Sequence, residues 1–130
     1  MEFAARGGSG ARYSWREGNP ISIRPAVEGK LYPVASDKFD RTPEGVYDLS
    51  GNALEWCDDW YYDDTFSRAA EKLDQPLKDF PGPGRSPDGQ ERVIKGGGDG
   101  SSWNRQGVSQ SDNNSMIGFR GVLRPNSIDR

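Results

Sequence analysis

Large apolar side chains are concentrated in one stretch of the chain, residues 45–62. This stretch holds five aromatic rings and four carboxylates around a Ser-Gly-Asn turn at residues 50–52. One ring buries about 150–250 Å² when it packs, so we expect the stretch to form the centre of the core. The pattern predicts a short strand over 46–49 and a mixed extended conformation over 53–60, with Leu54, Trp56 and Trp60 in the interior.

Other elements are short and widely spaced. Residues 2–6 read as the end of a helix, because the paired glycines that follow supply the left-handed conformation that ends helices. Pro33 cannot donate a backbone hydrogen bond, so residues 31–35 are predicted to form an edge strand or an extended segment. The pattern also predicts a turn over 42–45, a short helix over 65–72, and a central hairpin in which a strand over 91–95 pairs with one over 116–123.

A long loop separates the last two predicted strands. Residues 96–115 have no apolar periodicity of their own, and Trp103 and Val108 are the large apolar side chains within them. Loops of about 20 residues are uncommon in a compact domain and are usually functional or disordered. This segment is therefore a candidate binding surface, with a plain surface loop as the alternative.

Composition limits the possible functions. A length of 130 residues predicts one domain, residues 1–130, and 17 glycines with 9 prolines predict much irregular structure. The net charge is −3 with both signs interspersed, which argues against a nucleic-acid partner. The sequence contains no apolar run approaching 18 residues, so we expect no membrane insertion. The chain contains no histidine and one cysteine, Cys57, which removes intrachain disulfides and most imidazole-dependent chemistry.

Four short motifs resemble one known family. Residues 45–57, GVYDLSGNALEWC, are similar to the GLYDMxGNVWEWC signature of the formylglycine-generating-enzyme, or sulfatase-modifying-factor, family. Residues 2–8, 92–97 and 117–120 match flanking motifs in the family's order, so the resemblance covers about residues 2–124. It implies an α+β, C-type-lectin-like fold, here in a minimal version that lacks the usual N-terminal portion. A second chain or self-association could supply that portion.

The first predicted functional site is a calcium-binding site. Asp48 and Glu55 offer two hard carboxylates across the turn, the ligand type that Ca²⁺ prefers. In the resembled family a structural Ca²⁺ is held at matching positions, which implies the side chains of Asp48 and Glu55 and the carbonyls of Gly51 and Ala53. The alternative is that Glu55 caps a turn or pairs with Arg120. The family usually has Asn where Asp48 stands.

Catalysis by the family's copper mechanism is not expected. Cu(I) selects thiolates, and the family places its two catalytic cysteines in the segment that matches residues 96–115, where this chain has none. The family's iron-dependent sulfoxide synthases need histidines. Cys57 is expected to act as a small core residue, because a buried thiol ionises poorly. We therefore expect no catalytic residue and no copper.

Ligand display is the remaining expectation. In the variable proteins of diversity-generating retroelements, a branch of this family, the segment between the two flanking strand motifs is the binding face and is altered through adenine-rich Asn codons. Of the 17 residues from 99 to 115, 14 are of types that such mutation allows. The variable loop would cover about residues 98–116 and bind a protein or a glycan. Its predicted contact residues are Asp99, Ser101, Ser102, Trp103, Asn104, Arg105, Ser109, Ser111, Asp112 and Asn113.

Two rivals stay open. One is an oxidase of the formylglycine-generating or sulfoxide-synthase type, or a fragment of one. The other is a purely structural phage or cell-surface domain whose loop binds nothing. Near the C-terminal motif, Phe119 is predicted to fill the core, and Arg120 to form an ion pair with Glu55 or Asp59.

Overall fold

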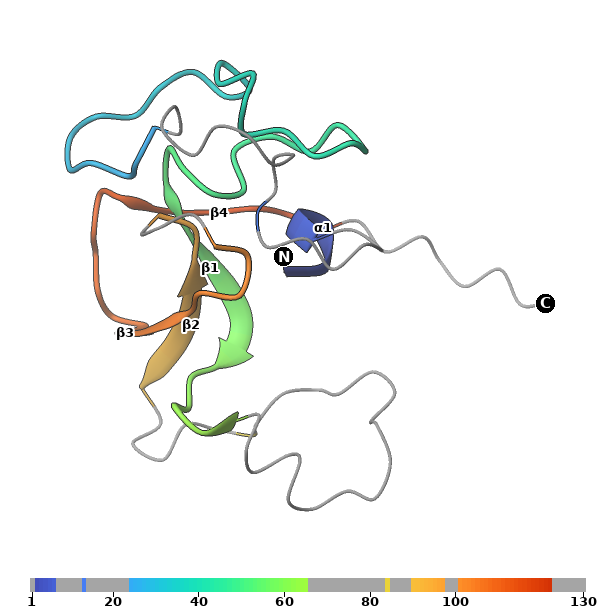
Figure 1. Ribbon diagram of the computed structural model, residues 1–130. Coiled ribbons are helices and arrows are strands. Elements are labelled where there is room, and N and C mark those ends of the chain that lie inside the picture. Colours follow the sequence, from blue (N-terminus) through green and yellow to red (C-terminus); the bar gives the residue numbers. More distant parts are fainter. Residues whose placement is uncertain are drawn as a thin grey trace, which may run out of the picture.

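The computed structural model describes residues 2–6, 13, 24–65, 84, 90–97 and 101–122. Within these residues the fold consists of one short helix and one small sheet (Figure 1). The elements are α1 (Glu2–Arg6), β1 (Leu54–Trp60), β2 (Glu91–Lys95), β3 (Gln106–Ser109) and β4 (Ile117–Phe119). The helix confirms the prediction for 2–6. The glycines that were expected to end it, most of the predicted 65–72 helix, and Asp99 lie outside the described residues.

The sheet has the strand order β3-β2-β1-β4. Strand β1 pairs antiparallel with β2, where Glu55 lies opposite Lys95 and Trp56 opposite Ile94, and parallel with β4, where Trp56 lies opposite Phe119. Strand β2 pairs antiparallel with β3 on its other side. The predicted hairpin between 91–95 and 116–123 is therefore wrong. Strand β1, which carries the signature, lies between β2 and β4 and pairs with one of them along each edge.

Strand β1 is more regular than its sequence predicted, although its register with β2 shifts between Trp56 and Trp60. Trp60 is covered by the guanidinium of Arg92, which lies 3.7 Å from the ring centroid. Leu54, Trp56 and Trp60 are half-buried rather than fully interior. The aromatic stretch therefore forms the middle of the sheet but is only partly enclosed by the described residues.

Both faces of the sheet contribute to the core. Val93 and Ile94 are adjacent on β2 and point to opposite faces, and their exposed fractions are 4% and 2%. Leu49 is also buried. The expectation that Phe119 fills the core is wrong, because this side chain is 84% exposed. It lies on the edge strand β4, which has a strand neighbour on one side only in the described structure.

Residues 24–50 form turns and extended segments at one end of the sheet (Figure 1). The predicted turn over 42–45 is confirmed, since Gly45 donates its N–H to the Thr42 carbonyl at 3.0 Å and has a φ of 88°. Of the two possibilities for 31–35 the edge strand is not formed, and the predicted strand over 46–49 is not formed either. In the second region only an isolated bridge joins Arg41 to Tyr47. No helix in the described residues has the length and apolar character needed to cross a membrane.

Candidate functional site

The signature turn at residues 50–52 is held by a buried carboxylate. Asp40 is 1% exposed, and its Oδ2 accepts the backbone N–H groups of Ser50 at 2.9 Å and Gly51 at 2.8 Å. A buried carboxylate is stable only when hydrogen-bond donors replace water around it. Asp40 thus fixes the path of the turn from ten residues upstream. The sequence analysis did not select it, and no motif in the sequence marks it.

Asn52, the asparagine of the same turn, ties a second segment to it. Its side-chain Oδ1 accepts the N–H of Tyr32 at 2.9 Å, and its Nδ2 donates to the Tyr32 carbonyl at 3.2 Å. The backbone N–H of Asn52 donates to the Arg24 carbonyl at 2.7 Å. Its φ of 65° lies in the left-handed region, which Asn tolerates better than most residues. The backbone of Tyr32 pairs with a side chain here, and a regular strand over 31–35 does not form.

A bidentate ion pair closes the other side of the turn. Arg120 donates to both carboxylate oxygens of Glu55, with Nη2–Oε1 and Nε–Oε2 distances of 2.7 Å and 3.1 Å. Its Nη2 also reaches the carbonyls of Tyr47 at 3.0 Å and Asp48 at 3.2 Å. The hydrogen bonds to Glu55 raise the pKa of Arg120, so it stays charged. This confirms the predicted pairing of Arg120 with Glu55.

Three of the four predicted calcium ligands already accept hydrogen bonds within the protein. Oδ2 of Asp48 accepts the N–H of Ala35 at 2.7 Å, and the Gly51 carbonyl accepts the N–H of Ala53 at 2.8 Å. Both oxygens of Glu55 are taken by a guanidinium. As arranged here, the Glu55 carboxylate can bind a calcium ion only if Arg120 moves away from it. Calcium binding stays a prediction.

The predicted contact segment begins with two buried serines. Ser101 and Ser102 are 8% and 6% exposed, and Asn104 donates its N–H to the Ser101 carbonyl at 3.2 Å in a tight turn. Trp103, which follows the two serines within this turn, is 47% exposed. Ser101 and Ser102 are thus poorly placed for a ligand, whereas Trp103 presents a large surface to solvent.

Arg105 is engaged within the protein. Its Nη2 donates to the Tyr62 carbonyl, its Nη1 lies 3.3 Å from Oγ1 of Thr65, and its guanidinium carbon lies 5.4 Å from the Tyr61 ring centroid. The interaction joins the contact segment to the chain that follows β1. We had predicted Arg105 as an adaptable ligand contact, but in this structure it fastens two segments together.

The middle of the segment is strand β3 rather than irregular loop. Gly107, in β3, lies directly under the ring of Tyr61, because a Cβ at this position would be 2.2 Å from Cδ1 of that ring. After the strand, Asp112 donates its N–H to the Ser109 carbonyl at 2.9 Å, which turns the chain toward β4. Three predicted contact residues stand exposed on this turn: Ser111, Asp112 and Asn113.

The exposed predicted contacts therefore form two groups. Trp103 and the half-buried Asn104 precede β3, and the half-buried Ser109 with residues 111–113 ends and follows it. Four residues of extended chain span about 13 Å, so the two groups lie at opposite ends of one edge strand. A ligand that touches both must extend over at least this distance.

Cys57 lies on β1 and is not part of either group of exposed contact residues. It is a free, half-buried thiol, and burial raises its pKa. The raised pKa lowers the fraction of reactive thiolate at neutral pH. Cys57 is thus less enclosed than the core position that the sequence predicted, and its role as a small packing residue stays a prediction.

Comparisons with known proteins place these features in a family. The model of the sulfatase-modifying factor enzyme 1-like domain matches residues 1–125. The chain is 38% identical over 97 residues to the serine/threonine-protein kinase Pkn1 of Chlamydia trachomatis serovar L2, a match that covers 74% of this chain and 14% of the kinase. It is 40% identical over 97 residues to Pkn1 of Chlamydia pneumoniae, with the same coverage.

An enzyme of the family is also similar. The formylglycine-generating enzyme of Streptomyces coelicolor is 29% identical over 111 residues, which cover 74% of this chain and 32% of the enzyme. The chain thus spans a third or less of the length of these relatives. No solved structure matches the chain significantly. The match over residues 1–125 shows that the chain belongs to the sulfatase-modifying factor enzyme 1-like domain family.

Proposed function

We propose that this chain is a non-enzymatic ligand-binding module in which a fixed, C-type-lectin-like α+β scaffold displays the ends of β3 to a protein or glycan. The observation that carries the proposal is the contrast along residues 101–113. Ser101, Ser102 and Arg105 are buried or bonded, whereas Trp103 and residues 111–113 are exposed. Anchored residues next to exposed ones are what a preordered contact surface requires.

The exposed residue types suit binding. Trp103 offers a large, rigid apolar surface of the kind found at interface hot spots. Ser111, Asp112 and Asn113 are short polar residues that make adaptable hydrogen bonds, as in antibody loops. Because the two groups lie about 13 Å apart along β3, a protein or an extended glycan fits them better than a single sugar.

Diversification by a retroelement is part of this proposal. Among the described residues, the five exposed or half-exposed predicted contacts other than Trp103 and Arg105 are all of types that adenine-directed mutation of Asn codons produces: Asn104, Ser109, Ser111, Asp112 and Asn113. The nucleotide sequence of the locus tests it. We expect a near-copy of the region that encodes residues 96–120, differing at adenines, beside a reverse-transcriptase gene. A locus without such a copy would reject diversification but leave ligand binding to the next experiment.

A pair of displayed libraries tests the binding surface. One library randomises Trp103, Asn104 and residues 111–113, and the matched control randomises the same number of anchored positions: Asp40, Asn52, Ser101, Ser102 and Arg105. We expect the first library to remain folded and to yield binders to a purified target such as streptavidin, and the control to lose protease resistance. Equal loss of folding in both, or no binders from the first, would favour a purely structural domain.

An oxidase, or a fragment of one, is the second candidate. It is favoured by the similarity to the Streptomyces coelicolor enzyme, whose name states its activity. The chain is incubated with copper, oxygen and a cysteine-containing sulfatase peptide, and the peptide mass is followed. Formylglycine production that disappears in Cys57→Ser would overturn the binding proposal, and an unchanged peptide is the expected result.

A further inference from the structure

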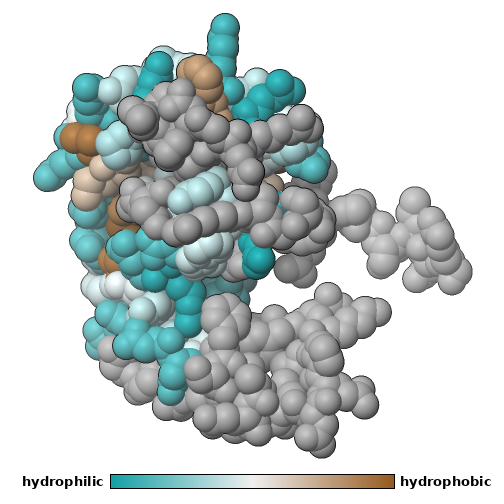
Figure 2. Space-filling view, in the orientation of Figure 1, coloured by the Kyte–Doolittle hydropathy of each residue, from teal (hydrophilic) through white to brown (hydrophobic). Residues whose placement is uncertain are grey.

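Exposed apolar side chains gather at the end of the molecule opposite the segment that follows β1. Of the seven large apolar residues that are exposed in the described structure, four lie between residues 27 and 39. They are Val27, Leu31, Val34 and Phe39, with exposed fractions of 44%, 62%, 85% and 58%. Figure 2 shows brown, hydrophobic residues beside teal, hydrophilic ones at this end. Exposed apolar residues scattered singly need no explanation, but four within 13 residues of the chain make this end a candidate interaction site.

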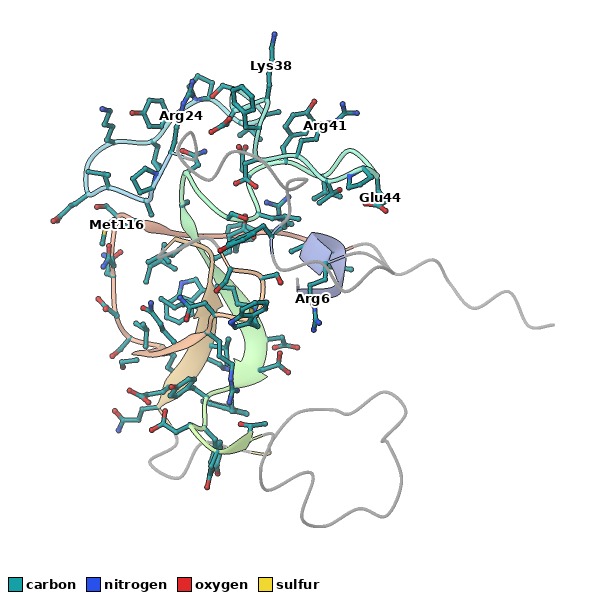
Figure 3. The ribbon with its side chains drawn as sticks, in the orientation of Figure 1. Arg6, Arg24, Lys38, Arg41, Glu44 and Met116 are labelled. Atoms are coloured by element: carbon teal, nitrogen blue, oxygen red, sulfur yellow. The ribbon has the colours of Figure 1, made fainter. Side chains whose placement is uncertain are left out.

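The charge that this end shows to solvent is positive. Lys30, Lys38 and Arg41 are exposed and Arg24 is half-buried, and the labelled Arg24, Lys38 and Arg41 lie at the same end of the molecule in Figure 3. Glu28 is the one exposed carboxylate in residues 24–41, and the exposed Glu44 lies at the same end in Figure 3, so the exposed cations outnumber the exposed carboxylates. The sign is opposite to the chain's net charge of −3. We call residues 24–41 the basic apolar surface.

This positive charge arises because two carboxylates of the same stretch point inward. Asp40 is 1% exposed and accepts the backbone N–H groups of the signature turn. Asp37 is 7% exposed and accepts the N–H of Phe39 at 3.0 Å. Both carboxylates are therefore removed from the solvent-facing side, where the exposed Lys30, Lys38 and Arg41 remain.

The cations and their backbone are held in place. The guanidinium of Arg24 lies 4.5 Å, and the ammonium of Lys30 5.3 Å, from the centroid of the same Tyr32 ring. Arg41 lies 5.4 Å from the ring centroid of Tyr47. The backbone beneath is fixed by the Asn52 amide. A surface that is already ordered loses less entropy when it binds, and two cations beside one ring favour a carboxylate partner.

We propose that the basic apolar surface is a docking site for an acidic polypeptide segment that carries apolar side chains. The apolar residues supply burial, and Lys30, Lys38 and Arg41 supply the complementary charge. A nucleic acid would match the charge but not the exposed Leu31 and Val34. This site uses residues different from the ends of β3, so it stands or falls independently of the proposed ligand-binding function.

Peptide binding measured by fluorescence anisotropy tests the proposal. The probe is a labelled synthetic peptide of alternating glutamate and leucine, and the comparison peptide has lysine in place of glutamate. The test variant is Lys30→Gln with Lys38→Gln, and the matched control, with the same change in net charge, is Gln90→Glu with Ser115→Glu. We expect affinity for the acidic peptide to fall about tenfold in the first and less than about twofold in the second.

A second pair of variants separates the apolar contribution. Leu31→Ser with Val34→Ser should weaken acidic-peptide binding, whereas Val122→Ser, which changes an exposed side chain outside the surface, should not. Three results would overturn the proposal: equal loss in test and control variants, no preference for the acidic peptide, or tighter binding to phosphatidylserine vesicles than to the peptide. Sedimentation velocity is run alongside, because a dimer that the Lys30/Lys38 variant dissociates would make a second copy the occupant.

Discussion

The segment that leads into and includes the signature turn, residues 40–52, and the segment from Trp103 to Asn113 are both rich in Ser, Gly, Asn and Asp, yet they use these residues in opposite ways. In the first segment, the side chain of Asp40 bonds to backbone N–H groups of the turn, and that of Asn52 bonds to the backbone of Tyr32. In the later segment, Asp112 and Asn113 face solvent. Similar composition therefore serves as an anchor in one region and as a contact surface in the other.

Burial makes the difference between the two regions. A carboxylate that leaves water must find donors, so a buried position such as Asp40 accepts few replacements. An exposed carboxylate is solvated whatever its neighbours are, and its replacement changes stability little. If this explanation is right, the effects of substitution should decline from the turn to the exposed ends of β3.

The largest effect is expected at Asp40. In Asp40→Ala the N–H groups of Ser50 and Gly51 lose their acceptor in a buried site. Two hydrogen bonds to a charged group contribute about 3–4 kcal/mol, so the free energy of unfolding should fall by about that amount in urea denaturation. Asp40→Asn keeps one carbonyl acceptor and should lose clearly less. Equal losses in the two variants would show that the hydrogen bonds are not what fixes the turn.

Arg120 is the next test, on the other side of the turn. Arg120→Ala leaves Glu55 without its bidentate partner, and because the Arg120 side chain is 37% exposed we expect a loss of about 2–3 kcal/mol, below the value for fully buried pairs. The measurement is again urea denaturation. Arg120→Lys keeps the charge but cannot form the fork, so its loss should be intermediate.

The same variant sharpens the calcium prediction. In the wild-type chain Arg120 occupies both oxygens of Glu55, and adding Ca²⁺ in place of a chelator should change the melting temperature little. In Arg120→Ala the carboxylate is freed. If Asp48, Gly51, Ala53 and Glu55 form a calcium site, calcium should then restore part of the lost stability. A large calcium effect on the wild-type chain would instead mean that the ion displaces the guanidinium.

Substitution of Gly107 is expected to change stability less than substitution of Asp40 or Arg120 and more than substitution of the exposed residues after β3. A methyl group at this position would meet the ring of Tyr61 at 2.2 Å from Cδ1, so either the ring or β3 must move. We expect Gly107→Ala to lower the free energy of unfolding by about 1–2 kcal/mol through overpacking, as measured by thermal or urea denaturation. In a Tyr61→Ala background the ring is absent, so Gly107→Ala should no longer lower the free energy of unfolding. If it still does, the strain arises from another contact.

Sequence reasoning found the parts of this molecule that depend on local pattern. The signature stretch, the α1 segment, the 42–45 turn and the Arg120–Glu55 pair were predictable, because each follows from adjacent residues or from a motif. Strand pairing was not. Strand β1 accepts partners on both edges, and nothing local shows that β4 joins it in parallel while residues 106–109 add a fourth strand to β2.

The candidate site was predictable to a similar extent. The exposed character of residues 111–113 followed from their polar types, whereas the 47% exposure of Trp103 did not, because a Trp side chain is usually well buried. The burial of Ser101 and Ser102 and the engagement of Arg105 did not, because they depend on where the chain after β1 passes. Asp40 gave no signal at all, since its partners lie ten and eleven residues away and any surface aspartate looks the same in sequence.

The reactivity of Cys57 tests how well β1 is shielded from solvent. Burial raises the pKa of its thiol, so the folded chain holds the proton at pH values where the unfolded chain has begun to lose it. Stability should therefore fall as pH rises through the pKa of the unfolded thiol, and native Cys57 should react with iodoacetamide more slowly than in urea. Native labelling as fast as unfolded labelling would point to an activated thiol and favour the oxidase alternative.

The smallest effect is expected at the turn after β3. Ser111→Ala, Asp112→Ala and Asn113→Ala each remove an exposed polar side chain, and each should change the free energy of unfolding by less than about 0.5 kcal/mol in urea denaturation. The hydroxyl of Ser111 lies 2.9 Å from that of Ser109 in an exposed hydrogen bond, so Ser111→Ala should mark the upper end of this range. A loss at Asp112 that approaches the loss at Asp40 would mean that this turn is also an anchor. Its tolerance to diversification would then disappear, and with it the reason to regard the ends of β3 as a contact surface.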